Sequence, residues 1–174
     1  MEINRICGYH GTTEDRAKEI LKNQDFVDST RDNEWLGTGV YFFAYLGHAK
    51  WWIQAKRYRG QDTCILMANL VYKQEQHLDL DDPDVLGVVE EVVREAVRIA
   101  NEASKTGVGV NLEAEHPSKK WNFACNTYRK ICPEIGIISY TFTTPREFEY
   151  IGYTQTQKQI CVSDHTIIKD IKKI

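Results

Sequence analysis

The fold is decided by two short stretches, Gly8-Tyr9-His10-Gly11-Thr12-Thr13 and Trp35-Leu36-Gly37-Thr38-Gly39-Val40-Tyr41-Phe42-Phe43. In each stretch, glycines stand beside a short apolar run that is typical of a buried strand. The first places an imidazole, a glycine and a hydroxyl where its strand ends, a position from which side chains can face a cleft. A lone histidine after a strand is more often structural, and a tyrosine in an apolar run is more often core. The two stretches together, in this order, are much more specific.

Periodicity along the chain predicts an α+β fold with a split, mainly antiparallel sheet. We expect one domain over residues 1–174, with helices inserted in the middle of the chain at about residues 82–132. Helices are predicted from a cap at Thr12 or Thr13 to Asn23, and over Gly47–Tyr58, Val85–Ala103 and Ser118–Cys132. Strands are predicted over Ile6–Tyr9, Val40–Phe43, Cys64–Tyr72, Gly136–Phe142, Phe148–Tyr153 and Gln159–Val162.

Composition limits the class of protein. The 174 residues carry a net charge of −3, a poor match for a protein that coats nucleic acid, although a nucleic acid touched at one local site stays open. The five cysteines form no Cys-x-x-Cys pair, which favours reduced thiols over a disulfide framework or a zinc site. The sequence shows neither a secretory leader nor an apolar run of membrane-spanning length. We therefore expect a soluble, cytoplasmic protein that does not bind membranes.

An acidic cluster precedes the first of the two middle helices. Asp79, Asp81, Asp82 and Asp84 surround Pro83. Carboxylates in this position usually cap the following helix. A metal site is the alternative interpretation.

The two opening stretches resemble a known family. His10-Gly11-Thr12 followed by Gly37-Thr38-Gly39-Val40-Tyr41-Phe42 is similar to the first two signature motifs of the diphtheria-toxin-like, or PARP-like, ADP-ribosyltransferases. The third motif of that family is a strand that usually begins with glutamate. The matching strand here is Lys158–Asp164, with Gln159 at the glutamate position. Gln157 and Glu149 are the alternatives if the third motif is misaligned.

The resemblance implies NAD as the co-substrate and no metal. In that case His10 would bind a hydroxyl of the adenosine-side ribose, the Gly11 backbone would bind the nicotinamide amide, and Thr12 would assist nearby. Tyr41 would stack on the nicotinamide ring, as suits a flat cationic partner.

A second aromatic side chain is expected from the following helix. Trp51 is the preferred candidate, because Ala49-Lys50-Trp51 follows the family pattern, and Trp52 is the alternative. A core role is as common for either one. The catalytic residues implied by the resemblance are therefore His10, Tyr41 and Gln159.

Gln159 decides which reaction is expected. A glutamine can orient a hydroxyl but cannot accept its proton, so we predict transfer of single ADP-ribose units and no chains. The acceptor would be a macromolecule, either RNA, DNA or protein, and the polar segment Tyr153–Lys158 is expected to be a loop that helps to choose it. The small chain suits a bacterial or phage toxin or defence effector, with an antitoxin as a partner. The alternatives are a catalytically inactive module that binds NAD or ADP-ribose, and a structural domain whose motifs are coincidental.

Overall fold

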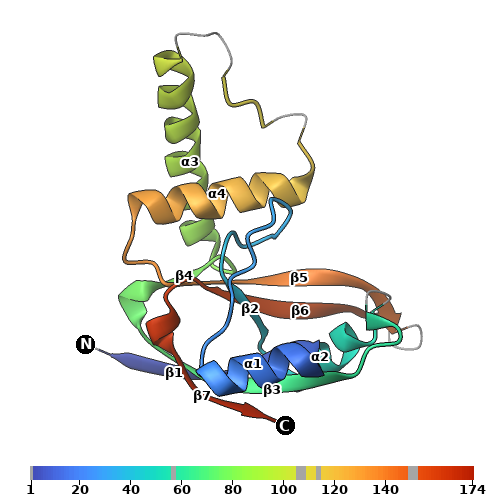
Figure 1. Cartoon of the computed structure of the whole chain (residues 1–174). Helices are drawn as coiled ribbons and strands as arrows, with labels where there is room; N and C mark the ends of the chain where they lie inside the picture. The colour runs from blue at the N-terminus through green and yellow to red at the C-terminus, as the bar shows by residue number, and fades with distance from the viewer. Residues whose placement is uncertain (1, 56–57, 105–108, 113–114, 149–152) are drawn as a thin grey trace.

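A computed structural model describes residues 2–55, 58–104, 109–112, 115–148 and 153–174 (Figure 1). These residues build one seven-stranded sheet in the order β4-β5-β6-β2-β1-β3-β7, in which only β4 and β5 run parallel. The predicted α+β class with a mainly antiparallel sheet is confirmed. The strands are β1 (Ile3–Thr13), β2 (Val40–Phe43), β3 (Thr63–Lys73), β4 (His77–Asp79), β5 (Ile137–Phe148), β6 (Tyr153–Val162) and β7 (Ile168–Lys173). The helices are α1 (Glu14–Asn23), α2 (Leu46–Ile53), α3 (Pro83–Ala103) and α4 (Pro117–Ile131).

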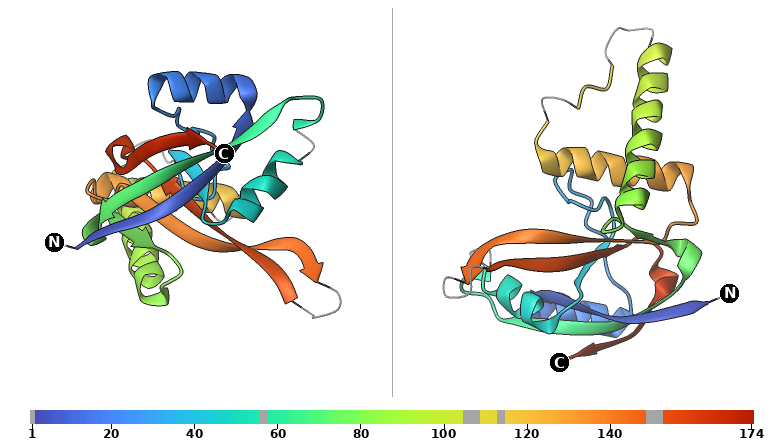
Figure 2. Two further views of the ribbon diagram at one scale, coloured as in Figure 1. Left: turned by 90° about the horizontal axis from the view of Figure 1, so that it is seen from below. Right: turned by 180° about the vertical axis from the view of Figure 1, so that it is seen from behind.

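The two short helices cover opposite faces of β1 and β3. Successive residues of a strand point to opposite faces of its sheet. Leu66 of β3 packs in one apolar cluster with Ala17 of α1, whereas Ile65 packs in another with Ala49 of α2. Figure 2 shows the two helices on either side of these strands. The part of the sheet that carries β1 is therefore shielded on both faces.

The two middle helices form an extension beside the other half of the sheet (Figures 1 and 2). Helix α4 crosses α3, and α3 runs on past it, away from the strands. A third apolar cluster joins this extension to the sheet through Val89 and Val93 of α3, Cys125 of α4, and Ile138 and Cys161 of β5 and β6. The helices lie close to the predicted bounds of residues 82–132.

The sheet opens between β1 and β2. β1 pairs with β3 along its whole length, from Ile3 opposite Lys73 to Thr13 opposite Thr63. In the described register, β1 pairs with β2 only where Tyr9 lies opposite Phe43. Beyond this pair the end of β1 and the beginning of β2 are not joined by a ladder. This opening is where the two sequence motifs face one another.

The C-terminal strands differ from the prediction. The expected separate strand Phe148–Tyr153 is wrong, because Phe148 ends β5 and Tyr153 begins β6, while residues 149–152 lie outside the described residues. The expected loop Tyr153–Lys158 is also wrong, since it pairs with β5 as the first part of β6. The sequence analysis missed β4 and β7. Both are short strands that are held by partners distant in the sequence.

Helix ends follow local side chains. Thr13, one of the two expected caps, accepts a hydrogen bond from the Arg16 amide at 3.4 Å, and Gln24 ends α1 in the left-handed region at φ 50°. Asp82 caps α3 by accepting from the Asp84 amide at 2.9 Å. The predicted second helix is shorter than expected, since α2 ends at Ile53.

The acidic cluster is divided between two structural roles. Asp82 caps α3, while Asp79 and Asp81 form ion pairs with Lys158 at 3.1 and 2.8 Å. Among the described residues no group of three or more His, Cys, Asp or Glu side chains is arranged to hold a metal ion.

All five cysteines are free thiols. In the described part of the chain, no helix is both long and apolar enough to cross a membrane.

Candidate functional site

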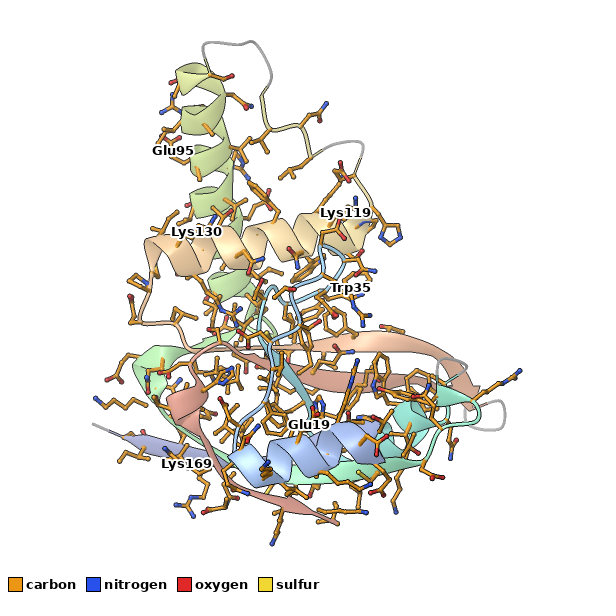
Figure 3. The ribbon with its side chains drawn as sticks, in the orientation of Figure 1. Glu19, Trp35, Glu95, Lys119, Lys130 and Lys169 are labelled. Carbon is orange, nitrogen blue, oxygen red and sulfur yellow. The ribbon has the colours of Figure 1, made fainter. Side chains whose placement is uncertain are left out.

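A cavity of about 690 Å³ lies at the opening between β1 and β2. Its walls come from the end of β1, from α1, from the segment of residues 25–39, from β2 and α2, from Tyr58 and Gln61 between α2 and β3, and from one residue of β6. Figure 3 shows Glu19 on α1 and Trp35 of the 25–39 segment, which lies between α4 and the sheet. Five of the six residues singled out from the sequence line this cavity: His10, Gly11, Thr12, Tyr41 and Gln159.

His10 bridges the opening of the sheet. Its ring nitrogen Nδ1 lies 2.8 Å from the main-chain oxygen of Tyr41, across the gap that β1 and β2 leave. A carbonyl oxygen can only accept, so this hydrogen bond places the proton on Nδ1 and makes Nε2 the acceptor of the neutral ring. The ring packs edge-on against Phe26 and Phe42, with centroids 5.1 and 6.0 Å away. The orientation of the imidazole is therefore fixed from two sides.

Tyr41 has a structural role that the sequence did not reveal. Its hydroxyl donates to the Gly37 carbonyl at 2.7 Å and accepts from the Leu36 amide at 2.9 Å. Its side chain packs against the apolar cluster that contains Leu36 and Cys161. Burial strongly raises the pKa of the Tyr41 hydroxyl, which therefore stays protonated and able to donate. Tyr41 thus shapes the wall of the cavity, and its stacking on a ligand stays a prediction.

Trp52, and not the preferred Trp51, lines the cavity. A Cβ built on Gly11 would lie 3.2 Å from Cδ1 of Trp52 and 2.7 Å from Cγ2 of Ile53. The glycine of the first motif is therefore needed where β1 passes close to α2, in addition to any approach of a ligand. Trp52 also packs edge-on against Phe43, with centroids 5.8 Å apart. Of the two candidates that the sequence offered, the alternative Trp52 is therefore the one placed at the cavity, and a ligand contact of either tryptophan stays a prediction.

Gln159 reaches the cavity from the third motif. Gln159 lies opposite Phe43 in the β2–β6 ladder. Two positions along the same ladder, and so on the same face of the sheet, Tyr41 lies opposite Cys161. Of the two alternatives, Gln157 is nine-tenths buried, and its Oε1 has no hydrogen-bond partner among the described residues. Glu149 lies outside the described residues. Of the two described candidates for the third-motif position, Gln159 is the one that lines the cavity.

Both signs of charge line the cavity. Arg16 and Arg31 are the cations, and no ion pair joins either guanidinium to a carboxylate within the part of the chain that the structure describes. The carboxylates come from Glu19, Asp25, Asp28 and Glu34. Arginine is well suited to phosphate groups because its planar donors form bidentate hydrogen bonds. Arg16 and Arg31 are therefore the lining groups that could bind an anion, although the named carboxylates of the lining outnumber them.

The 25–39 segment is held from outside by a histidine that the sequence analysis missed. Nδ1 of His165 lies 2.6 Å from Asp25 Oδ1, and Nε2 lies 2.9 Å from Asp28 Oδ1. Burial lowers the pKa of His165, but the hydrogen bonds and charges of Asp28 and Asp25 outweigh this, and the net pKa is raised. Phe26, between the two aspartates, packs on His10. No local pattern reveals this contact, since about 140 residues separate its members.

The fold and the site define the protein as an α+β protein with a polar, aromatic-lined cavity where a mainly antiparallel sheet opens. The chain is 22% identical over 190 residues to Uncharacterized protein MJ0359 of Methanocaldococcus jannaschii, in a match that covers 99% of this chain and 88% of that protein. That name states no activity. No model of a known protein family matches the chain, and no solved structure matches it.

Proposed function

We propose that the protein is a mono-ADP-ribosyltransferase that transfers ADP-ribose from NAD to a macromolecular acceptor. One observation supports this most strongly. Strands β6, β2 and β1 are neighbours in the sheet, and one cavity is lined by Gln159, Tyr41 and His10 from these strands. Three motifs that are distant in the sequence thus contribute to one site. The cavity volume of about 690 Å³ lies within the range of small-molecule and cofactor sites.

Each ligand group has a matching residue in the proposal. Nε2 of His10 accepts a hydrogen bond from a ribose hydroxyl, since Nδ1 already donates to Tyr41 O. The guanidinium groups of Arg16 and Arg31 bind the diphosphate. Trp52 offers an aromatic face to the nicotinamide ring, whose positive charge favours such a partner. The backbone of Gly11 binds the nicotinamide amide.

The reaction requires little acid–base chemistry from the protein. The bond between C1′ of the ribose and the nicotinamide nitrogen breaks, and its electron pair neutralises the ring that leaves. The acceptor nucleophile forms a new bond to C1′ and gives up its proton to the solvent. The protein holds the dinucleotide in a reactive conformation. Gln159 orients a hydroxyl of the nicotinamide-side ribose but takes up no proton, which limits the reaction to single additions.

Incubation with NAD and a cell extract tests the proposal. The purified protein is expected to release nicotinamide and to add single ADP-ribose masses to protein or nucleic acid. His10→Asn is the informative variant, because its amide can replace the Nδ1 donor but offers nothing at the Nε2 position. We expect His10→Asn to lower turnover at least about a hundredfold, because the site loses a group that positions the substrate. His116→Asn, a substitution at the cap of α4, is the matched control, because asparagine is itself a good cap.

A second function is favoured by Gln159. An amide where polymerising members of the family carry a carboxylate also suits a module that binds NAD or ADP-ribose without turnover. Saturable binding that His10→Asn weakens, without nicotinamide release, would support this candidate. Two predictions remain: that the protein acts as a toxin or defence effector, and that an antitoxin is its partner. Comparing the growth of cells that express the wild type with that of cells that express His10→Asn would test them.

A further inference from the structure

Helix α4 contacts the second sequence motif through one arginine. Nη1 of Arg129 donates to the Thr38 carbonyl at 2.7 Å and to the Leu36 carbonyl at 3.4 Å, and Nη2 donates to the Cys161 carbonyl at 3.1 Å. One guanidinium thus joins the glycine-rich segment before β2 to strand β6, which carries the third motif.

The guanidinium is committed to these carbonyls. Its Nε is buried and has no hydrogen-bond partner among the described residues, and no carboxylate pairs with it there. Arg129 is half-buried, and a partly desolvated cation without a counter-ion is costly unless hydrogen bonds compensate it. The three carbonyl contacts are the compensation that the structure shows, and they fix the backbone that carries those carbonyls.

Asn126, one helical turn earlier, contacts the preceding peptide, between Gly37 and Thr38. Its Oδ1 accepts from the Thr38 amide at 2.9 Å. A Cβ built on Gly37 would lie 2.6 Å from that oxygen, and Gly37 has φ 81°, which glycine adopts without strain. Both the amide and the carbonyl of Thr38 are therefore held by α4. The glycine at position 37 permits this close approach.

The held peptide continues directly into the cavity wall. The Thr38 carbonyl belongs to the peptide bond with Gly39, and Gly39 exchanges two main-chain hydrogen bonds with Ser29, at 2.9 and 3.1 Å. Gly39 and Ser29 both line the cavity. A shift of the Thr38 peptide would therefore move the wall opposite His10.

We propose that Arg129, assisted by Asn126, is a positioning residue that holds the Leu36–Gly39 backbone in the conformation required to bind NAD. The helical extension is then a support of the site and not a separate module. This proposal rests on the proposed function for its ligand. Arg129 touches no ligand itself, so its loss acts through the position of the backbone.

The test compares Arg129→Met with Lys130→Met on the full chain. Lys130 is exposed, is the next residue of α4 (Figure 3), and loses the same charge in its variant. In Arg129→Met, hydrogen exchange of the Thr38 amide is expected to accelerate about tenfold or more, while the Leu66 amide in the core exchanges as in the wild type. The KM for NAD is expected to rise about tenfold with a smaller change in kcat, and Lys130→Met should change neither quantity. A tenfold change in the KM corresponds to the loss of about one hydrogen bond to a charged group.

Arg129→Lys keeps the charge and reaches fewer carbonyls, so it should restore part of the KM and part of the exchange protection. It also serves as the test if Arg129→Met does not fold. A folded Arg129→Lys with unchanged Thr38 exchange and unchanged KM would overturn the proposal.

The two hypotheses fail separately. If the wild type neither binds nor consumes NAD, the proposed function is wrong, while the exchange of the Thr38 amide still reports whether Arg129 holds this backbone.

Discussion

Replacing Tyr41 by phenylalanine tests the geometry of the cavity wall. The substitution keeps the ring and removes the hydroxyl, which leaves the Leu36 amide without its partner and the Gly37 carbonyl with only the weak Cys161 thiol donor at 3.7 Å. An unsatisfied buried polar group costs about 1–3 kcal/mol, so we expect the free energy of unfolding to fall by about that amount. For a chain of this size, each kcal/mol corresponds to about 2–4 °C in the melting temperature.

Urea denaturation is the appropriate assay, because a shift of the midpoint at constant slope reports stability alone. Tyr45→Phe is the matched control, since Tyr45 is 66% exposed and surface substitutions usually change stability by less than about 0.5 kcal/mol. Equal stability of the Tyr41→Phe and Tyr45→Phe proteins would refute the structural role of the Tyr41 hydroxyl. Tyr41→Ala, which also removes the packed ring, is expected to cost about 3–5 kcal/mol. Activity lost in that variant would then not show that Tyr41 stacks on a ligand.

Three further perturbations follow from the structure. The pKa of His165 is raised in the folded protein, so its stabilising effect is present below the unfolded pKa of about 6.5 and is lost as the pH rises through the folded value. Urea titrations between about pH 5.5 and 8.5 should show this decline of the free energy of unfolding in the wild type and not in His165→Gln. Lys158→Met leaves Asp79 and Asp81 without their cation, and should lower the free energy of unfolding by about 1–2 kcal/mol, which is less than the loss of one partner of a fully buried ion pair would cost. If Lys158→Met is as stable as Lys169→Met, a control at an exposed lysine, the ion pairs do not stabilise the protein. Products resolved by mass after long incubation with excess NAD should carry single ADP-ribose units, and Gln159→Glu should change turnover or NAD hydrolysis; an unchanged rate in that variant would show that the third motif is misaligned.

Local sequence patterns were sufficient for much of the fold. The Thr13 cap, the end of α1 at Asn23 and the end of α3 at Ala103 depend on neighbours in the sequence, and the structure agrees with these predictions. Strands β4 and β7 were missed because their pairing with β5 and β3 depends on distant partners. Polar residues in the first part of β6 resembled a loop for the same reason, since only pairing with β5 makes them a strand.

The candidate site shows the same limit. The motifs predicted which strands would supply residues, but they did not predict where each side chain would point. Whether Trp51 or Trp52 faces the cavity depends on the rotation of α2. The two hydrogen bonds of the Tyr41 hydroxyl depend on the path of the loop before β2. The contacts of Arg129 and His165 join positions far apart in the chain, and no spacing pattern contains them.

Nicotinamide release from NAD by the wild type and by His10→Asn, in the presence of the same cell extract, tests the central claim most directly. The variant also loses the contacts of the ring with Phe26 and Phe42, so the rates are compared at a temperature at which both proteins are folded. We predict steady release by the wild type and a rate at least about a hundredfold lower for the variant, because the Nε2 contact is removed while the amide replaces the Nδ1 donor. Equal rates in the two proteins, or no release above that of the extract alone, would contradict a transferase site at the opening between β1 and β2.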